Sequence, residues 1–183
     1  MKPTKMVVNK PIQFKNIILW RHAEAVDLIN LDSEISHSIN HNINHSSEQD
    51  DLSRALTTHG QQQAKKMAQW LTQHLPNDTN FQCSPALRAF QTADALKYKI
   101  NINQAFKPGI NLQQALSAVA RLPDEGNLLL VGHQPYLGQL AGYLLGISEF
   151  EIHIKKGAIW WLRRLESAPG RYQIMTVQTP SKL

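Results

Sequence analysis

The chain has 183 residues, of which 42% are hydrophobic, so it is long enough for one domain with a core of ordinary size. Its 19 basic and 14 acidic residues leave a formal net charge of +5. That excess suits an acidic or phosphorylated partner, but no basic run resembles a nucleic-acid-binding arm. The single cysteine, Cys83, excludes an intrachain disulfide and indicates a reducing compartment. No apolar run approaches a membrane span. We therefore expect a cytoplasmic protein that binds neither nucleic acid nor membrane.

Apolar runs that alternate with capping residues predict strands that alternate with helices. In chain order, the expected elements are strand 16–20, helix 60–75, strand 81–83, helix 84–97, helix 111–122, strand 127–131, helix 135–145, strand 158–165 and strand 172–177. Thr57 or Thr58 is expected to cap the first helix, and Ser84 the second. This order predicts a three-layer α/β/α domain with a central, mainly parallel open sheet and a C-terminal antiparallel hairpin.

One segment differs in composition from the rest of this single domain of residues 1–183. Residues 30–50 are rich in Asn, Ser and His, which predicts a flexible insertion. His37, His41 and His45 recur every four residues, and on a helix they would share one face, as metal ligands do. Because Asn and Ser are poor helix formers, we favour a solvated loop and expect no metal.

Two histidines follow apolar strands directly. His22 comes after strand 16–20, with Arg21 beside it, and His133 comes after strand 127–131. Because ligand sites of open parallel sheets lie at the carboxyl ends of the strands, both side chains are expected to meet there. Arg54 lies just before a predicted helix, and Arg88 lies in the first turn of another, where the helix dipole favours an anion.

This combination of side chains suits phosphoryl chemistry. Arginine forks match phosphoryl oxygens two at a time and stay charged at any relevant pH. A neutral imidazole can attack phosphorus and hold the phosphoryl group, and a second, protonated imidazole can donate to an oxygen as charge shifts. Because the arginines supply the positive charge, this chemistry needs no metal and no cofactor.

Four ordered segments carry a family resemblance, namely Leu19–Ala25, Arg54–Gly60, Ser84–Ala93 and Val131–Pro135. They resemble the R-H-G, R-x-L-T-x-x-G, S-P-x-x-R-A-x-Q-T and V-x-H-x-P segments of the histidine phosphatase superfamily, which has a phosphoglycerate mutase-like fold. The short chain and the alanine after His22 resemble the SixA-type phosphohistidine phosphatases, whose members act on phosphotransfer proteins.

The resemblance implies roles for five residues. His22 would be the nucleophile that is phosphorylated during turnover. His133 would be a second catalytic histidine in the same pocket, and Arg21, Arg54 and Arg88 would bind the phosphate. The implied substrate is a phosphorylated protein, such as a histidine phosphotransfer protein.

The sequence departs from the family at the general acid. Asn111 takes the acidic place, and an amide cannot donate a proton as an acid does. Glu24 is the nearest remaining carboxyl and a candidate proton donor, and Asp124 and Glu125 precede the last motif strand. Because an imidazole with a pKa near 6.5 leaves more readily than an alkoxide, the missing acid favours a phosphoramidate such as phosphohistidine, or an acyl phosphate, over a sugar phosphate as substrate.

Two alternative functions stay open at this stage. One is a binding module for phosphorylated ligands with weak or lost catalysis. The other is a phosphatase for small phosphate esters. The final residues, Ser-Lys-Leu, have the form of a peroxisomal address, which applies only in a eukaryote.

Overall fold

The computed structural model describes residues 11–27, 48–123, 126–147 and 152–183. Its strands are β1 (Asn16–Arg21), β2 (Thr79–Cys83), β3 (Asn101–Ile102), β4 (Asn127–Gly132), β5 (Ile159–Arg164) and β6 (Tyr172–Gln178). Its α-helices are α2 (Glu48–Ser53), α3 (Thr58–His74), α4 (Leu87–Asp94), α5 (Leu112–Ala120) and α6 (Tyr136–Leu145), and two 3-10 turns are η1 (Gln104–Phe106) and η2 (Pro180–Lys182). None of these helices is long and apolar enough to cross a membrane.

The strands form one sheet in the order β3-β2-β4-β1-β5-β6. The first four strands in that order pair in parallel, whereas β5 runs antiparallel to β1 and β6 antiparallel to β5. The predicted fold is therefore confirmed: a mainly parallel open sheet with a C-terminal antiparallel hairpin. The central β1 is buried along nearly its whole length, as its apolar sequence NIILW predicts.

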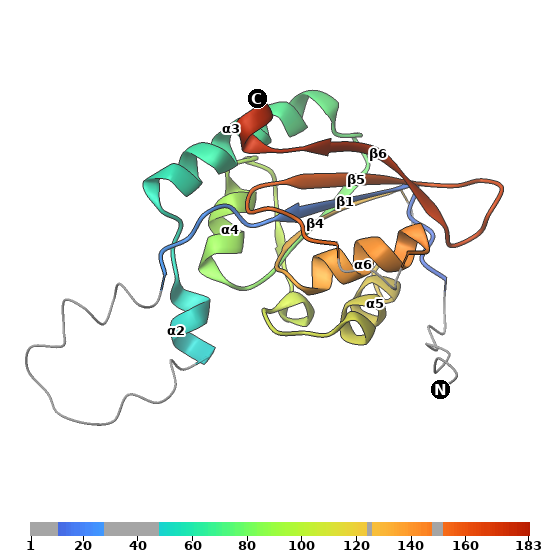
Figure 1. Ribbon diagram of the computed structural model, residues 1–183, viewed down its shortest axis with the longest axis horizontal. Coiled ribbons are helices and arrows are strands. Elements are labelled where there is room, and N and C mark those ends of the chain that lie inside the picture. The colour runs from blue at the N-terminus through green and yellow to red at the C-terminus, as the bar shows by residue number, and fades with distance from the viewer. Residues whose placement is uncertain (1–10, 28–47, 124–125, 148–151) are drawn as a thin grey trace, which may run out of the picture.

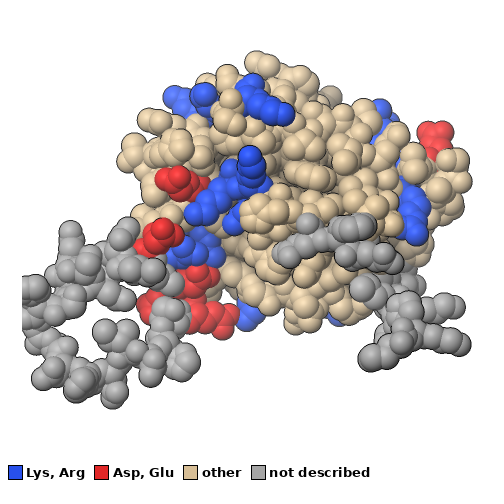
Figure 2. Space-filling model, in the orientation of Figure 1, with Lys and Arg blue, Asp and Glu red and all other residues tan. Residues whose placement is uncertain are grey.

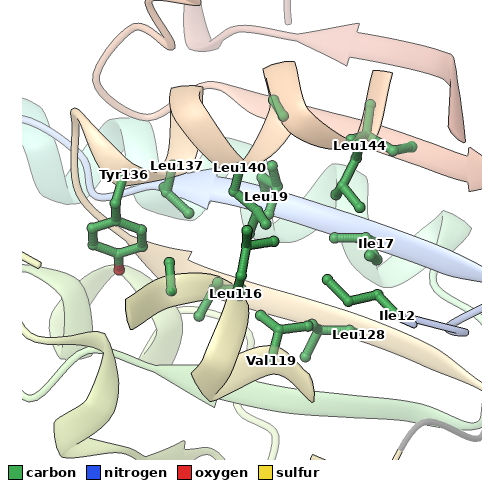
Figure 3. Packing of buried hydrophobic residues seen from close by; sticks show 14 of the residues in the cluster. Ile12, Ile17, Leu19, Leu116, Val119, Leu128, Tyr136, Leu137, Leu140 and Leu144 are labelled. Carbon is green, nitrogen blue, oxygen red and sulfur yellow. The ribbon is translucent and has the colours of Figure 1, made fainter. Parts of the chain in front are cut away.

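Helices cover both faces of the sheet (Figure 1). Successive side chains of a strand point to opposite faces, so Ile17 and Leu19 of β1 pack against α5 and α6. Figure 3 shows this cluster, with Leu116 from α5 and Leu140 from α6 facing β1. On the other face, Ile18 and Trp20 pack against α3 and α4. Trp160 and Trp161 of β5 divide between the two clusters in the same way.

The start of α3 is fixed on the segment that follows β1. The Thr57 side chain caps the helix by accepting a hydrogen bond from the Gly60 N–H at 2.9 Å, as the sequence predicts. A Cβ on Gly60 would lie 1.9 Å from the Glu24 carbonyl oxygen. Only glycine allows this close approach, which holds the N-terminus of α3 against the chain just beyond His22.

The structure corrects several local predictions. Helix α4 begins at Leu87 and ends at Asp94, and its N-cap is Ala86 rather than Ser84, whose hydroxyl contacts His133. Residues 48–50 were predicted as loop but begin α2. The short β3 was missed, since its two residues are exposed and carry no strand pattern. The rest of the predicted insertion, up to residue 47, lies outside the described residues.

Candidate active site

Two histidines meet at the carboxyl end of the sheet. Arg21 lies opposite Gly132 in the parallel pair of β1 and β4. The His22 N–H donates to the Gly132 carbonyl at 3.0 Å, so the residues after both strands leave the sheet side by side. The ring centroids of His22 and His133 lie 5.0 Å apart, and both side chains are buried. The prediction that the two histidines meet is confirmed.

Three arginines surround this pair. Arg21 ends β1, Arg54 precedes α3, and Arg88 lies in the first turn of α4. The charges of all three lower the pKa values of both imidazoles. The fold therefore brings together the five residues that the sequence analysis singled out, although more than a hundred positions separate the first from the last.

The orientation of the His22 ring leaves a lone pair on one nitrogen. Its Nδ1 lies 2.7 Å from the carbonyl oxygen of Ala23. Because a carbonyl oxygen only accepts, Nδ1 carries the proton and Nε2 keeps its lone pair. Burial lowers the pKa of His22, the bond to Ala23 partly offsets this, and the three arginine charges add to the lowering, to about 3. The lowered pKa favours a neutral ring at physiological pH, with a lone pair on Nε2.

His133 is held by a serine from the neighbouring strand end. Its Nε2 lies 2.7 Å from the Ser84 hydroxyl, and Ser84 is fully buried just beyond β2. Burial first, and then the neighbouring His22 and the three arginine charges, lower the pKa of His133 to about 2. The residue pattern alone predicts a protonated imidazole at this position. Burial, together with the charges of His22 and the arginines, favours the neutral form of His133, which has a single N–H to donate.

Three buried donor or acceptor atoms of this cluster lack a hydrogen-bond partner among the described residues: Nε of Arg21, Nε of Arg88 and Nδ1 of His133. A buried polar atom without a partner costs free energy comparable to a lost hydrogen bond. A bound oxyanion could supply acceptors for these unpartnered N–H groups. The cluster therefore has the donor set and the positive charge that a phosphoryl group requires.

A residue that the sequence analysis missed contacts two of the arginines. The Asp51 carboxylate of α2 lies 2.8 Å from Nη2 of Arg88, and 3.0 and 2.9 Å from Nε and Nη2 of Arg54. Its carbonyl oxygen also accepts from Nη1 of Arg88. One feature of the sequence could have pointed to Asp51. It lies three positions before Arg54, and oppositely charged residues at this spacing on a helix can form an ion pair.

The carboxylate of the candidate proton donor Glu24 contacts residues at the start of α3. Its carboxylate accepts from the Thr57 hydroxyl at 2.9 Å and contacts Nδ1 of His59 at 3.3 Å. Hydrogen bonds from Thr57 and then His59 lower the pKa of Glu24, which favours its ionised form. An acid catalyst must be protonated, so this arrangement does not favour the role, which stays a prediction.

Asn111, which takes the place of the general acid in the resemblance, caps a helix. It is the N-cap of α5: its side-chain oxygen accepts from the Gln114 N–H at 3.0 Å, and the Gln114 side chain accepts from the Asn111 N–H at 2.9 Å. This reciprocal capping box explains the residue without any catalytic role.

The remaining candidates from the sequence fall outside the structure's description. His37, His41 and His45, and also Asp124 and Glu125, lie outside the described residues. Within the part of the chain that the structure does describe, no group of three or more His, Cys, Asp or Glu side chains could hold a metal ion.

Comparison with known proteins identifies the family. The model of the histidine phosphatase superfamily (branch 1) matches residues 17–111, which include His22 and all three arginines. The chain belongs to this superfamily. It is 35% identical over 136 residues to an uncharacterized protein of Picosynechococcus sp., with 69% of this chain and 80% of the relative covered. It is 27% identical to a phosphohistidine phosphatase SixA homolog of Haemophilus influenzae, with 72% and 77% covered.

A solved structure shows the same fold. The protein histidine phosphatase SixA complexed with tungstate superposes with a TM-score of 0.68 at 21% identity, covering 91% of this chain and 98% of that one. This likeness shows the fold, and the family match supports a phosphatase activity. Both curated relatives are bacterial, so the comparisons give no support to a peroxisomal address at residues 181–183.

Proposed function

We propose that this protein is a metal-independent phosphatase that removes phosphate from phosphohistidine on a protein, through a phosphorylated His22. The observation that carries the proposal is the bond from Nδ1 of His22 to the Ala23 carbonyl, which keeps the Nε2 lone pair available beside three arginines. The likeness to the SixA homolog supports the substrate class.

In the first step, the phosphoryl oxygens bind the guanidinium groups of Arg21, Arg54 and Arg88. Nε2 of His22 attacks phosphorus; a bond from Nε2 to phosphorus forms as the bond from phosphorus to the leaving nitrogen breaks. The arginines stabilise the negative charge on the transferred group, and the N–H of a neutral His133 adds one further donor. The protonated Nδ1 of His22 becomes part of a phosphoimidazolium held by the Ala23 carbonyl.

In the second step, water attacks the phosphorus of phosphorylated His22. The bond from phosphorus to Nε2 breaks, the electron pair returns to the imidazole, and the proton lost by water leaves with inorganic phosphate or passes to solvent. The products are free His22 and phosphate. The cycle uses water as its only co-reactant, and the positive charge comes from the arginines.

The substrate class follows from the leaving group. The carboxylates of Glu24 and Asp51 are held ionised by hydrogen bonds and charges, and Asn111 caps a helix. None of these three residues therefore supplies the proton that an alkoxide leaving group requires. A phosphohistidine ring can take a proton from solvent on its other nitrogen and leave as neutral imidazole. The site therefore favours phosphohistidine over alkyl phosphates.

The test compares phosphate release from a phosphorylated histidine phosphotransfer protein, p-nitrophenyl phosphate and phosphoserine, in the presence of EDTA. We expect the order phosphohistidine, then the aryl ester, then phosphoserine, and a loss of about 10³-fold or more for His22→Asn. His74→Asn, which removes an exposed histidine at the end of α3, is the matched control and should retain activity.

Two results would replace the proposal. A wild-type protein that binds phosphate but releases none from any substrate would be a binding module, with Asn111 marking the lost catalysis. A protein that hydrolyses phosphoserine at least as well as phosphohistidine would be a phosphatase for small esters. Activity that EDTA abolishes would contradict the metal-independent mechanism.

A further inference from the structure

The strongest charge cluster outside the histidine pair joins α2 to the candidate phosphate site. The two oxygens of the Asp51 carboxylate divide between two arginines: Oδ1 accepts from Arg54, and Oδ2 accepts from Arg88. In Figure 1, α2 lies at the end of the sheet toward which the β1 arrow points, and Figure 2 shows acidic and basic side chains against one another there. One carboxylate thus links the segment before α3 to the first turn of α4.

The Asp51 contacts leave part of each guanidinium for a ligand. A guanidinium has five N–H groups. Arg54 donates from Nε to Asp51 and from Nη1 to the Val26 carbonyl, and its Nη2 lies 2.9 Å from the same Asp51 oxygen, so at least one N–H remains on each terminal nitrogen. Arg88 donates from Nη1 and Nη2 to Asp51, and its buried Nε is one of the atoms without a partner. The bridge therefore orients both arginines without using up their donors.

The two arginines need such a bridge because they repel each other. Burial lowers the pKa of Arg88, and the charge of Arg54 lowers it further, whereas the hydrogen bond and charge of Asp51 raise it. The Arg88 side chain is only 3% exposed, so water cannot screen the repulsion. A buried charge that loses its partner is strongly destabilised and would swing toward solvent.

We infer that Asp51 is a positioning residue that fixes Arg54 and Arg88 as one phosphate clamp, which makes α2 part of the phosphate site. This inference rests on the proposed function, since it assigns the two arginines to phosphate. At the start of the same helix, Glu48 pairs with Lys107 at 2.7 Å, but both side chains are exposed, so this screened pair contributes little to the position of α2. The opposite role for Asp51, an internal anion that competes with phosphate, predicts a change of the opposite sign when the carboxylate is removed.

The test measures the dissociation constant of inorganic phosphate by calorimetry, and KM and kcat for a phosphohistidine protein. Asp51→Asn keeps the size of the side chain and removes its charge. We expect phosphate binding at least about tenfold weaker, a raised KM and a lowered kcat, because the clamp also holds the transition state. Glu48→Gln is the matched control: it removes one charge from the same helix and should change phosphate binding less than twofold.

Two further variants keep the inference testable. Asp51→Glu retains the charge, so phosphate binding should be weakened less than in Asp51→Asn; it also serves if Asp51→Asn unfolds. In an Arg54→Ala background, Asp51→Asn should weaken phosphate binding by a smaller factor than it does in wild type. The reason is that Arg54, one of the two arginines of the clamp, is already absent. Phosphate binding that is unchanged or tighter without the Asp51 carboxylate would overturn the inference. Because binding is measured without turnover, an inactive wild type would contradict the proposed function and leave this comparison intact.

Discussion

The Ser84 hydroxyl lies 2.7 Å from Nε2 of His133, and this contact ties the end of β2 to the end of β4. Both residues are buried, and Ser84 also accepts a hydrogen bond from the Ala86 N–H at 3.3 Å. The serine therefore fixes the rotation of the imidazole that faces His22. It does so from the loop that leads into α4, the helix that carries Arg88.

Replacing Ser84 with alanine should slow catalysis without unfolding the protein. The variant leaves Nε2 of His133 without its partner, so the ring loses its fixed orientation, and kcat for the phosphohistidine protein should fall about tenfold. Steady-state kinetics measure this, with thermal unfolding as the check on folding. Ser117→Ala on α5 is the control and should behave as wild type. Unchanged kcat in Ser84→Ala would show that the contact has no catalytic value.

Replacing Arg88 with lysine should strongly reduce activity, although both residues are positively charged. A lysine ammonium has no planar fork, so it cannot contact the Asp51 carboxylate and a phosphoryl oxygen in the same directions. We expect kcat/KM to fall about 10²-fold, with phosphate binding also weakened. The same exchange at the exposed Arg121, which caps the end of α5, should leave both quantities unchanged. Near wild-type activity in Arg88→Lys would remove Arg88 from the phosphate site.

The buried histidines should make the folded protein sensitive to acid. Burial lowers the pKa values of His22 and His133 to about 3 and about 2, whereas unfolded histidine titrates near 6.5. Between these values the unfolded chain binds protons that the folded chain does not, so stability falls as pH drops below about 6.5. Each residue contributes a slope of about 1.4 kcal/mol per pH unit.

Urea unfolding of wild type and His22→Asn at pH 8, 7, 6 and 5 measures this slope. Below pH 6.5, the free energy of unfolding of the variant should fall less steeply with decreasing pH than that of wild type, by about 1.4 kcal/mol per pH unit. At pH 8 both imidazoles are neutral in the folded and in the unfolded state. The difference in the free energy of unfolding between wild type and variant at this pH therefore reports contacts within the fold and not proton binding. Identical slopes for the two proteins would mean that His22 is not buried as a neutral group.

Gly60→Ala should destabilise the protein through the backbone. The added Cβ would lie 1.9 Å from the Glu24 carbonyl oxygen, so α3 must move away from the segment that carries His22. We expect a loss of about 2–3 kcal/mol in the free energy of unfolding, together with reduced activity. Gln61→Ala, at the neighbouring exposed position, should cost less than about 0.5 kcal/mol. A fully stable Gly60→Ala would contradict the close packing of these two segments.

The positions of His22 and His133 could be predicted because the signal is local. Each residue follows an apolar run that stops abruptly, and the carboxyl ends of adjacent parallel strands must lie together. The hairpin of β5 and β6 was predictable for the same kind of reason, since a proline and a glycine separate two apolar runs.

The contribution of Asp51 and the state of His133 could not be predicted in this way. Asp51 acts through Arg88, 37 positions away, and depends on how α2 packs against α4. The charge of His133 depends on burial and on three arginines that only the fold assembles. Ser84 was expected to cap a helix, but the cap is Ala86, and the contact of the Ser84 hydroxyl with His133 depends on how the two strand ends meet.

The central claim is a phosphoryl group on Nε2 of His22. The most direct measurement mixes the protein with phosphoramidate or a phosphohistidine protein, stops the reaction in alkali within milliseconds, and maps the phosphorylated peptide by mass spectrometry. We expect one phosphoryl group on His22 that is stable to alkali, labile to acid and absent from His22→Asn. Rapid turnover with a label on another residue, or with no labelled residue and a fully active His22→Asn, would contradict it.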